Sequence, residues 1–180
     1  QFDESLKMAA REEVFQTFDS LLRNNESLGQ LIKSDHIVIN EILADYYGLS
    51  GVSGNEFQRV PLPPTSPRGG LLGMAAILAM GSDGERASPV ERGAWVLRKV
   101  LHNPPPPAPA NVPQLSRLTE KLLSVRDLQS AHMEEPQCAQ CHRKIDPIGF
   151  GLHNFDATGQ WRDKETVSLI ANKKVRRTKT

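Results

Sequence analysis

The chain has few cysteines, little net charge and a modest share of hydrophobic residues, and each shortage narrows its possible functions. Only two of its 180 residues are cysteines, so zinc sites with four cysteines, or with three cysteines and one histidine, are excluded within this chain. Two cysteines do not argue for a disulfide framework either. The formal net charge of +1 gives no global field that would favour nucleic acid or an anionic membrane. No apolar run approaches the length of a membrane span.

Both cysteines belong to one motif, Cys138-Ala139-Gln140-Cys141-His142, with C-x-x-C-H spacing. This spacing is typical of c-type haem attachment, in which two thiols add to the vinyl groups along one porphyrin edge. His142 follows directly and is expected to bind the iron as proximal ligand. We therefore predict one haem c, covalently bound through Cys138 and Cys141. A zinc site with two cysteines and two histidines, or a redox dithiol, remains an alternative, although dithiol motifs usually follow a strand.

Helical periodicity dominates the rest of the chain. Apolar residues recur at helical spacing over 5–23, with Asp3 or Ser5 as a possible cap. Further helices are predicted over 27–33, 36–47, 89–101 and 115–131. A short strand fits 57–62, and the apolar segment 71–80 is either a buried helix or a haem-facing segment. Glycine and proline mark a loop over 48–70, and a proline-rich extended strap is predicted over 103–113.

These patterns predict a mostly α protein, a cytochrome c-like helical haem domain with long Pro/Gly-rich loops and an N-terminal helical segment. Three parts are expected: an N-terminal helical segment over 1–60, the haem domain over 61–163, and a basic tail over 164–180 that is disordered by default. Hydrophobic residues make up 38% of the chain, which is little for a large core, so a haem would supply part of it. Because the chain begins with Gln1 and has no signal peptide, we expect a portion of a longer protein.

Several further motifs accompany the cysteines. His132 lies six residues before Cys138, and the motif is followed by Ile145–Phe150 (Ile-Asp-Pro-Ile-Gly-Phe), His153–Asp156 (His-Asn-Phe-Asp) and Gly159-Gln160-Trp161-Arg162. This order resembles the C-terminal haem segment of the large multidomain c-type cytochromes abundant in planctomycetes. The resemblance extends upstream through Arg68–Met74, Ser88–Gly93, the proline strap and Asn40–Ala44, so that it covers about 5–163. His153 stands where that family usually has Glu. The family consists mainly of domains of unknown function, and its electron-transfer role is inferred from the haem.

The surroundings of the motif suggest how a haem would be held. Asp146-Pro147 and Gly149 are expected to turn the chain tightly beneath the ring, and the carbonyl of Pro147 is a candidate acceptor for the second nitrogen of His142. The predicted hydrophobic wall consists of Phe150, Leu152, Phe155 and Trp161. Arg143 and Arg162 either pair with the propionates or are ordinary surface residues.

The sixth iron ligand has several candidates. His132 is the first choice, because the resemblance includes it and because six residues suffice to reach around the haem edge. Met74 is the alternative, since a thioether is a common partner of His on a c-type haem. Met80, Met133, His102 and His153 follow, and an open sixth position is a further alternative. His36 is expected at the surface or as a helix cap.

Electron transfer is the leading functional expectation, with redox partner proteins or other domains of the same parent protein as partners. In this reading no residue is catalytic and the compartment is periplasmic or otherwise extracytoplasmic. The first alternative is a peroxidase or oxygen-activating haem enzyme, with His132, His153 or Glu134 as acid or base. The second is a haem-stabilised binding module of an extracytoplasmic assembly, with residues 1–60 as its docking surface.

Overall fold

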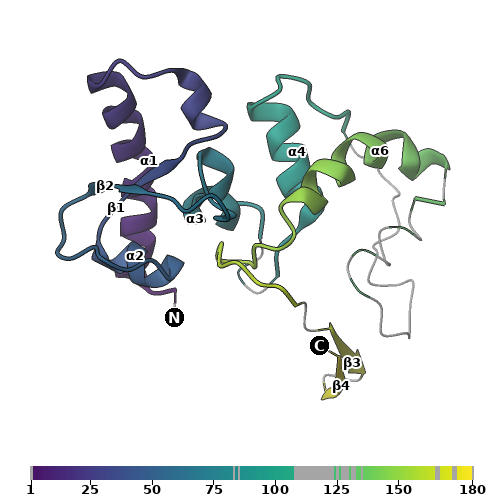
Figure 1. Ribbon diagram of the computed structural model, residues 1–180. Helices are drawn as coiled ribbons and strands as arrows, with labels where there is room; N and C mark the ends of the chain where they lie inside the picture. Colours follow the sequence, from purple (N-terminus) through teal and green to yellow (C-terminus); the bar gives the residue numbers. More distant parts are fainter. Residues whose placement is uncertain are drawn as a thin grey trace. The chain divides into compact units, whose positions relative to one another are not determined.

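The computed structural model describes residues 2–82, 84, 86–107, 124, 126, 130, 133–134, 136–164, 167–171 and 174–179. The chain forms two compact units. The first comprises Gln1–Ser88 with Phe155–Trp161, and the second comprises Pro89–Asn154 with Arg162–Thr180. About half of the structure is helical, and small two-stranded sheets accompany the helices (Figure 1), so the structure agrees with the helical part of the predicted class. None of the helices in the described ranges is long and apolar enough to cross a membrane.

The first helix, α1, spans Glu4–Arg23, close to the predicted range. Its N-cap is Asp3, whose carboxylate accepts a hydrogen bond from the backbone N–H of Leu6 at 3.0 Å. This bond satisfies one of the donors that every helix leaves open at its start. A short 3-10 helix, η1, follows over Leu28–Leu31, and Ser27 is its N-cap, as predicted.

The helix predicted over 36–47 is wrong in its first part. Strand β1 (His36–Ile39) pairs antiparallel with β2 (Gln58–Pro61), and helix α2 spans only Glu41–Tyr47. Three of the four β1 residues are β-branched, which favours an extended backbone, and all four are buried. A short apolar run cannot be assigned by periodicity alone, and pairing with β2 decides this one. The strand predicted over 57–62 is confirmed.

The core of the first unit joins α1, β1, α2 and a short helix α3 (Ala75–Ala79), which follows the 3-10 helix η2 (Leu71–Gly73). Its buried apolar residues are Leu6, Ala9, Ala10, Ile37, Ile39, Leu43, Ala44 and Ala75. The apolar segment 71–80 is therefore mainly helical, and its first α-helical residue lies in this core.

A loop from much later in the sequence, Phe155–Trp161, completes the first unit. Its turn is closed by Asp156, whose carboxylate Oδ1 accepts a hydrogen bond from the backbone N–H of Thr158 at 2.8 Å. Gly159 has a φ of +82°, and a Cβ there would lie 2.8 Å from the Cα of Ala75. Only glycine accommodates both this backbone conformation and this approach.

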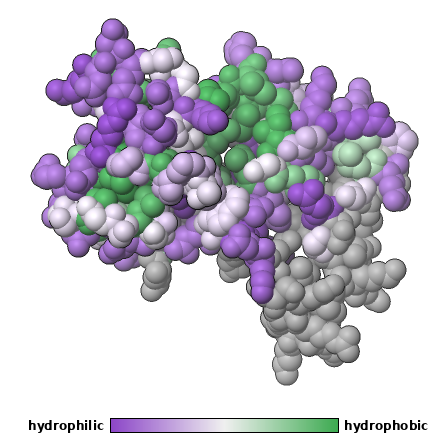
Figure 2. Space-filling view, in the orientation of Figure 1, coloured by the Kyte–Doolittle hydropathy of each residue, from purple (hydrophilic) through white to green (hydrophobic). Residues whose placement is uncertain are grey.

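The second unit is built on two helices, α4 (Pro89–Lys99) and α6 (Pro136–Gly151), whose backbones touch. A Cβ on Gly93 of α4 would overlap the carbonyl oxygen of Ile145, and a Cβ on Gly149 of α6 would overlap that of Pro89. Glycine at both crossing points lets the two helices pack at close range. Figure 2 shows hydrophobic residues gathered over α4, whereas the surface of the first unit is largely hydrophilic.

The remaining predicted segments have different outcomes. The tail expected to be disordered instead contains two antiparallel strands, β3 (Val167–Ala171) and β4 (Lys174–Lys179). The proline strap is described only over 103–107, without regular structure, and its remainder lies outside the described residues. Most of the helix predicted over 115–131 lies outside them as well.

Candidate functional site

Helix α6 carries the whole C-x-x-C-H motif in its first two turns. At 100° per residue, Cys138, Cys141 and His142 fall within an arc of about 100° on one helix face. Cys138 is 8% exposed, and Cys141 packs against the buried cluster of α4 and α6 residues that includes Ile145. The two cysteines do not form a disulfide bond with each other. The structure thus brings the two thiols and the imidazole to the same side of one rigid element.

The imidazole of His142 is held by a carboxylate one helical turn further on. Its Nδ1 lies 2.9 Å from Oδ1 of Asp146. We expected the backbone carbonyl of Pro147 to accept the hydrogen bond from His142. In the structure the partner is the side-chain carboxylate of Asp146, one residue earlier. The i, i+4 spacing places the two side chains on neighbouring turns of the same face. A hydrogen bond at Nδ1 assigns Nε2 as the nitrogen that would bind a metal.

Asp146 is the most deeply buried charged residue of α6. The residue is 3% exposed. Its second oxygen, Oδ2, is buried and has no hydrogen-bond partner among the described residues. A buried carboxylate with one satisfied oxygen costs free energy that an apolar side chain would not. The bond to His142 is therefore the contact that accounts for an acid at this position.

The tight turn predicted around Asp146-Pro147 and Gly149 is wrong, because α6 continues to Gly151. Pro147 lies inside the helix and removes one main-chain hydrogen bond, the one that its missing N–H would donate to Arg143. The contact of Gly149 with α4 offers a physical reason why the helix persists, since tertiary packing overrides the local signal of Pro and Gly.

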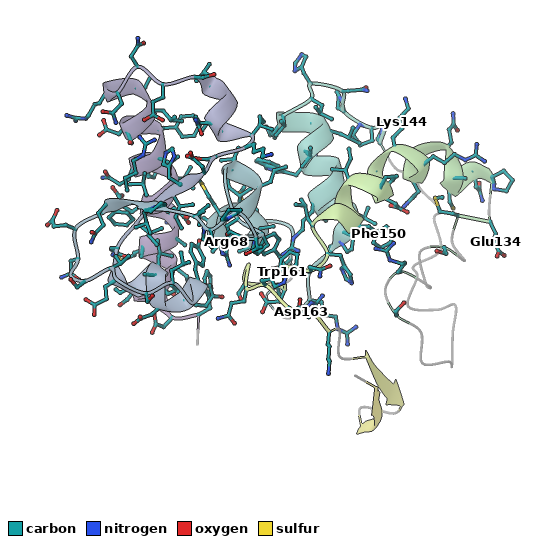
Figure 3. All side chains as sticks on the ribbon, viewed as in Figure 1. Arg68, Glu134, Lys144, Phe150, Trp161 and Asp163 are labelled. Carbon is teal, nitrogen blue, oxygen red and sulfur yellow. The ribbon has the colours of Figure 1, made fainter. Side chains whose placement is uncertain are left out.

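A cavity of about 460 Å³ lies beside Asp146. Its walls come from Arg126, Ser130, Met133, Asp146, Pro147, Phe150 and Gly151. The guanidinium carbon of Arg126 lies 4.6 Å from the ring centroid of Phe150, an arrangement that a cation–π interaction favours. Phe150 projects from the C-terminal part of α6 (Figure 3). One member of the predicted hydrophobic wall therefore lines a cavity next to the His142–Asp146 pair.

Two other members of that wall belong to the first unit. The rings of Phe155 and Trp161 meet edge to face at a centroid distance of 5.1 Å, and Phe155 is 3% exposed. Of the two predicted propionate partners, Arg143 is exposed on α6. Arg162 donates a hydrogen bond to the backbone carbonyl of His153 at 3.3 Å.

The candidate sixth ligands come from different segments of the chain. His132, the first choice, lies outside the described residues. Met74, the alternative, is 2% exposed in the first unit, where it precedes α3. Met133 lines the cavity beside Asp146. The remaining three are Met80 (58% exposed), His102 (exposed, with a φ of +48°) and His153, whose ring meets that of Phe150 edge to face. No three His, Cys, Asp or Glu side chains within the described ranges form a group that could hold a metal ion.

A buried polar cluster in the first unit had no recognisable sequence signal. Tyr47 donates a hydrogen bond to Oε2 of Glu13 at 2.6 Å and accepts one from the backbone N–H of Ala75 at 3.0 Å. Arg68 stacks on the Tyr47 ring with its guanidinium carbon 3.5 Å from the centroid. Burial raises the pKa of Glu13 from 4.5 to about 8, although the Tyr47 hydrogen bond and the charge of Arg68 oppose this shift. Glu13 is therefore mostly protonated at neutral pH.

His36 was expected at the surface or as a helix cap, and the structure buries it in β1 instead. Its Nδ1 lies 2.9 Å from both the Ser34 hydroxyl and the Asp35 carboxylate. The hydrogen bond with His36 lowers the pKa of Asp35. These contacts give His36 a structural role in the first unit.

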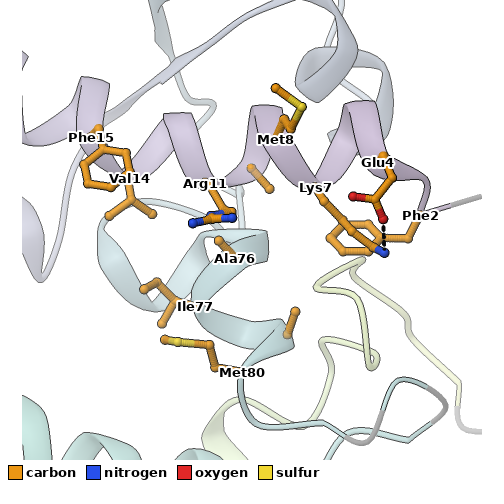
Figure 4. A pocket seen from close by; sticks show the side chains of 12 residues that line it. Phe2, Glu4, Lys7, Met8, Arg11, Val14, Phe15, Ala76, Ile77 and Met80 are labelled. Carbon is orange, nitrogen blue, oxygen red and sulfur yellow. Dashed lines mark hydrogen bonds and ion pairs between the residues drawn. The ribbon is translucent and has the colours of Figure 1, made fainter.

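The first unit also carries an apolar groove of about 560 Å³ between α1 and α3 (Figure 4). Met8, Phe15 and Met80 line it and are 58–70% exposed. Lys7 and Glu4 form an ion pair at its edge, at 2.6 Å. No residue of the C-x-x-C-H motif contributes to this groove.

Comparison with protein families divides the sequence into two segments. The family model PSCyt3, described as a protein of unknown function (DUF1588), matches residues 68–165. The model PSD4, described as a protein of unknown function (DUF1592), matches residues 1–49. Domains of both kinds are found in planctomycete-type multihaem cytochrome c proteins. No curated protein and no solved structure matches the chain.

Proposed function

Because the chain belongs to the PSCyt3 family (DUF1588), whose model covers more than half of it, we propose that it is an electron-transfer c-type cytochrome domain. It binds one haem covalently through Cys138 and Cys141, and His142 is the proximal iron ligand. The domain works outside the cytoplasm and exchanges electrons with redox partner proteins or with other domains of its parent protein.

The observation that carries this proposal is the placement of the motif on α6. Two thiols and an imidazole share one helix face, and the buried Asp146 holds the imidazole at 2.9 Å through Nδ1. This donor set suits a haem better than a zinc ion. A structural zinc site needs four ligands, and α6 offers only two cysteines and one histidine on this face. Cys141 and His142 follow Cys138 by three and four positions, which is the spacing of haem attachment. An oriented imidazole with Nε2 as the ligating atom is what an axial ligand requires.

The bound haem would supply one-electron oxidation and reduction of its iron. The protein's residues would anchor the ring, orient the axial imidazole and exclude water. The apolar surfaces that could do this in the second unit include Phe150 and Ile148 of α6. His132 remains the first choice for the distal ligand, and Met74 the alternative. The position of Met133 in the wall of the cavity beside Asp146 supports it as a further candidate for the distal ligand.

The test is periplasmic expression together with a c-type maturation system, followed by denaturing electrophoresis, a pyridine haemochrome spectrum and intact mass. We expect one haem that survives denaturation and a c-type haemochrome spectrum. The C138A/C141A double variant is the matched control and should carry none. Failure of the wild-type chain to acquire haem, in cells that mature another c-type cytochrome, would overturn the proposal.

A further inference from the structure

The hydrogen bond between His142 and Asp146 is short and shielded from water. The distance of 2.9 Å from Nδ1 to Oδ1 is that of a strong hydrogen bond, and a carboxylate acceptor makes it charge-assisted. Both groups are shielded from water, since the side chains are 17% and 4% exposed. Shielding strengthens the influence of the carboxylate on the imidazole, because the local dielectric constant is low.

Burial of Asp146 is difficult to explain by stability alone. Its neighbours on the same helix face include Ile145, a member of the apolar cluster with α4, and Oδ2 has no hydrogen-bond partner in the part of the chain that the structure describes. An apolar residue at this position would avoid the free-energy cost of desolvating a charge. The cost of burying the acid points to a role exercised through His142, its one hydrogen-bond partner among the described residues.

We propose that Asp146 is a positioning residue that fixes the tautomer and orientation of His142 and strengthens it as an iron ligand. This inference rests on the proposed haem site. A proton held on Nδ1 by the carboxylate leaves Nε2 as the ligating atom. The negative charge of Asp146 gives the imidazole partial imidazolate character, which stabilises the more positive, oxidised iron. A reduction potential lower than that of the same site without the carboxylate follows.

The helix itself makes this arrangement reproducible. His142 and Asp146 are one turn apart on α6, so their separation is set by helical geometry rather than by a flexible loop. Gly149 locks the following turn against Pro89 of α4. Pro147 lies between Asp146 and Gly149 and lacks the N–H that would donate a main-chain hydrogen bond within α6. The contact between Gly149 and α4 stabilises the helix at this interruption.

The first experiment compares midpoint potentials of haem-loaded variants by spectroelectrochemistry. D146N keeps an acceptor of similar shape but removes the charge, and its potential should rise relative to wild type. D146E restores the charge and should fall between the two. E134Q is the matched control, because Glu134 is an exposed acid close before α6 (Figure 3), and its loss should shift the potential less than D146N. Equal shifts in D146N and E134Q would refute the inference.

A second measurement needs no variant and therefore stands even if D146N does not fold. In the reduced low-spin protein, with carbon monoxide added if the iron is otherwise high-spin, the Nδ1 proton of His142 is observed by NMR. We expect slow exchange with solvent and a nuclear Overhauser contact to the β-protons of Asp146. Rapid exchange without this contact would overturn the inference. A wild-type chain without haem refutes the proposed function as well, whereas a haem-loaded chain lacking these signatures refutes only the role of Asp146.

Discussion

Gly93 of α4 lies against the backbone carbonyl of Ile145 of α6, so closely that any side chain at position 93 would displace one of the two helices. This contact joins the segment before the proline strap to the helix that carries the C-x-x-C-H motif. It also accounts for a glycine inside a helix, where glycine is less favourable than alanine by about 1 kcal/mol.

The Gly93 contact predicts that G93A destabilises the protein. Overpacking at a close helix crossing typically costs about 1–3 kcal/mol, because backbone has to move. Urea unfolding followed by circular dichroism measures the loss. The control is G151A, since a Cβ at Gly151 of α6 meets nothing within 4 Å and should leave stability unchanged or slightly raised. Equal stability of G93A and G151A would contradict the close packing of the helices.

Glu13 predicts a pH dependence of stability. Its pKa is raised from 4.5 to about 8 by burial, so the folded state binds a proton that the unfolded state releases between these values. The stabilisation from this group is therefore fully present below about pH 4.5 and is lost as the pH rises through about 8. Unfolding free energies across this range should fall less steeply in E13Q than in wild type. E12Q, at an exposed neighbouring position, should keep the wild-type slope.

We predict that replacing Arg68 with lysine makes the Phe155–Trp161 loop less ordered. Its guanidinium donates to the backbone carbonyls of Gly73 and Gly159, each at 2.6 Å, and lies over the Tyr47 ring. Lysine cannot keep the two divergent hydrogen bonds and the stacking together.

We expect R68K to cost about 1.5–3 kcal/mol, the range for hydrogen bonds to charged groups. Amide hydrogen exchange should accelerate at Gly159. R59K is the control, because Arg59 is 46% exposed and its ion pair with Glu26 should contribute less than about 1 kcal/mol. Unchanged exchange in R68K would show that other contacts hold the loop.

The distal ligand gives a prediction about haem spectra. With His132 as sixth ligand, the oxidised wild type should be low-spin and lack the weak red charge-transfer band of an Fe–Met bond. H132A should then become high-spin or change its ligand, whereas M74L should not alter the spectrum. The M74L change conserves volume at a site that is 2% exposed, so the fold should tolerate it. A charge-transfer band that disappears in M74L would instead identify Met74.

Local signals were sufficient for several elements. The apolar spacing and the Asp3 cap predicted α1, and the Gly48 C-cap, with its φ of +72°, marked the end of α2. The C-x-x-C-H spacing singled out Cys138, Cys141 and His142 as candidates without any structure, because the three residues lie within five positions of one another. Such features depend on residues within a few positions of each other, so they can be read directly from the sequence. That the three motif residues share one face of a helix is a result of the structure.

Other features depended on partners that are distant in sequence. His36–Ile39 became a strand because β2 lies beside it, and α6 continued through Pro147 where Gly149 meets Pro89. Burial among residues from α1, α2 and the Arg68 segment raised the pKa of Glu13. The sequence by itself determined most helices of the first hundred residues and the position of the C-x-x-C-H motif, from which we predict a haem. Only the tertiary structure decided which groups are buried together, because desolvation and close packing depend on every neighbour in space.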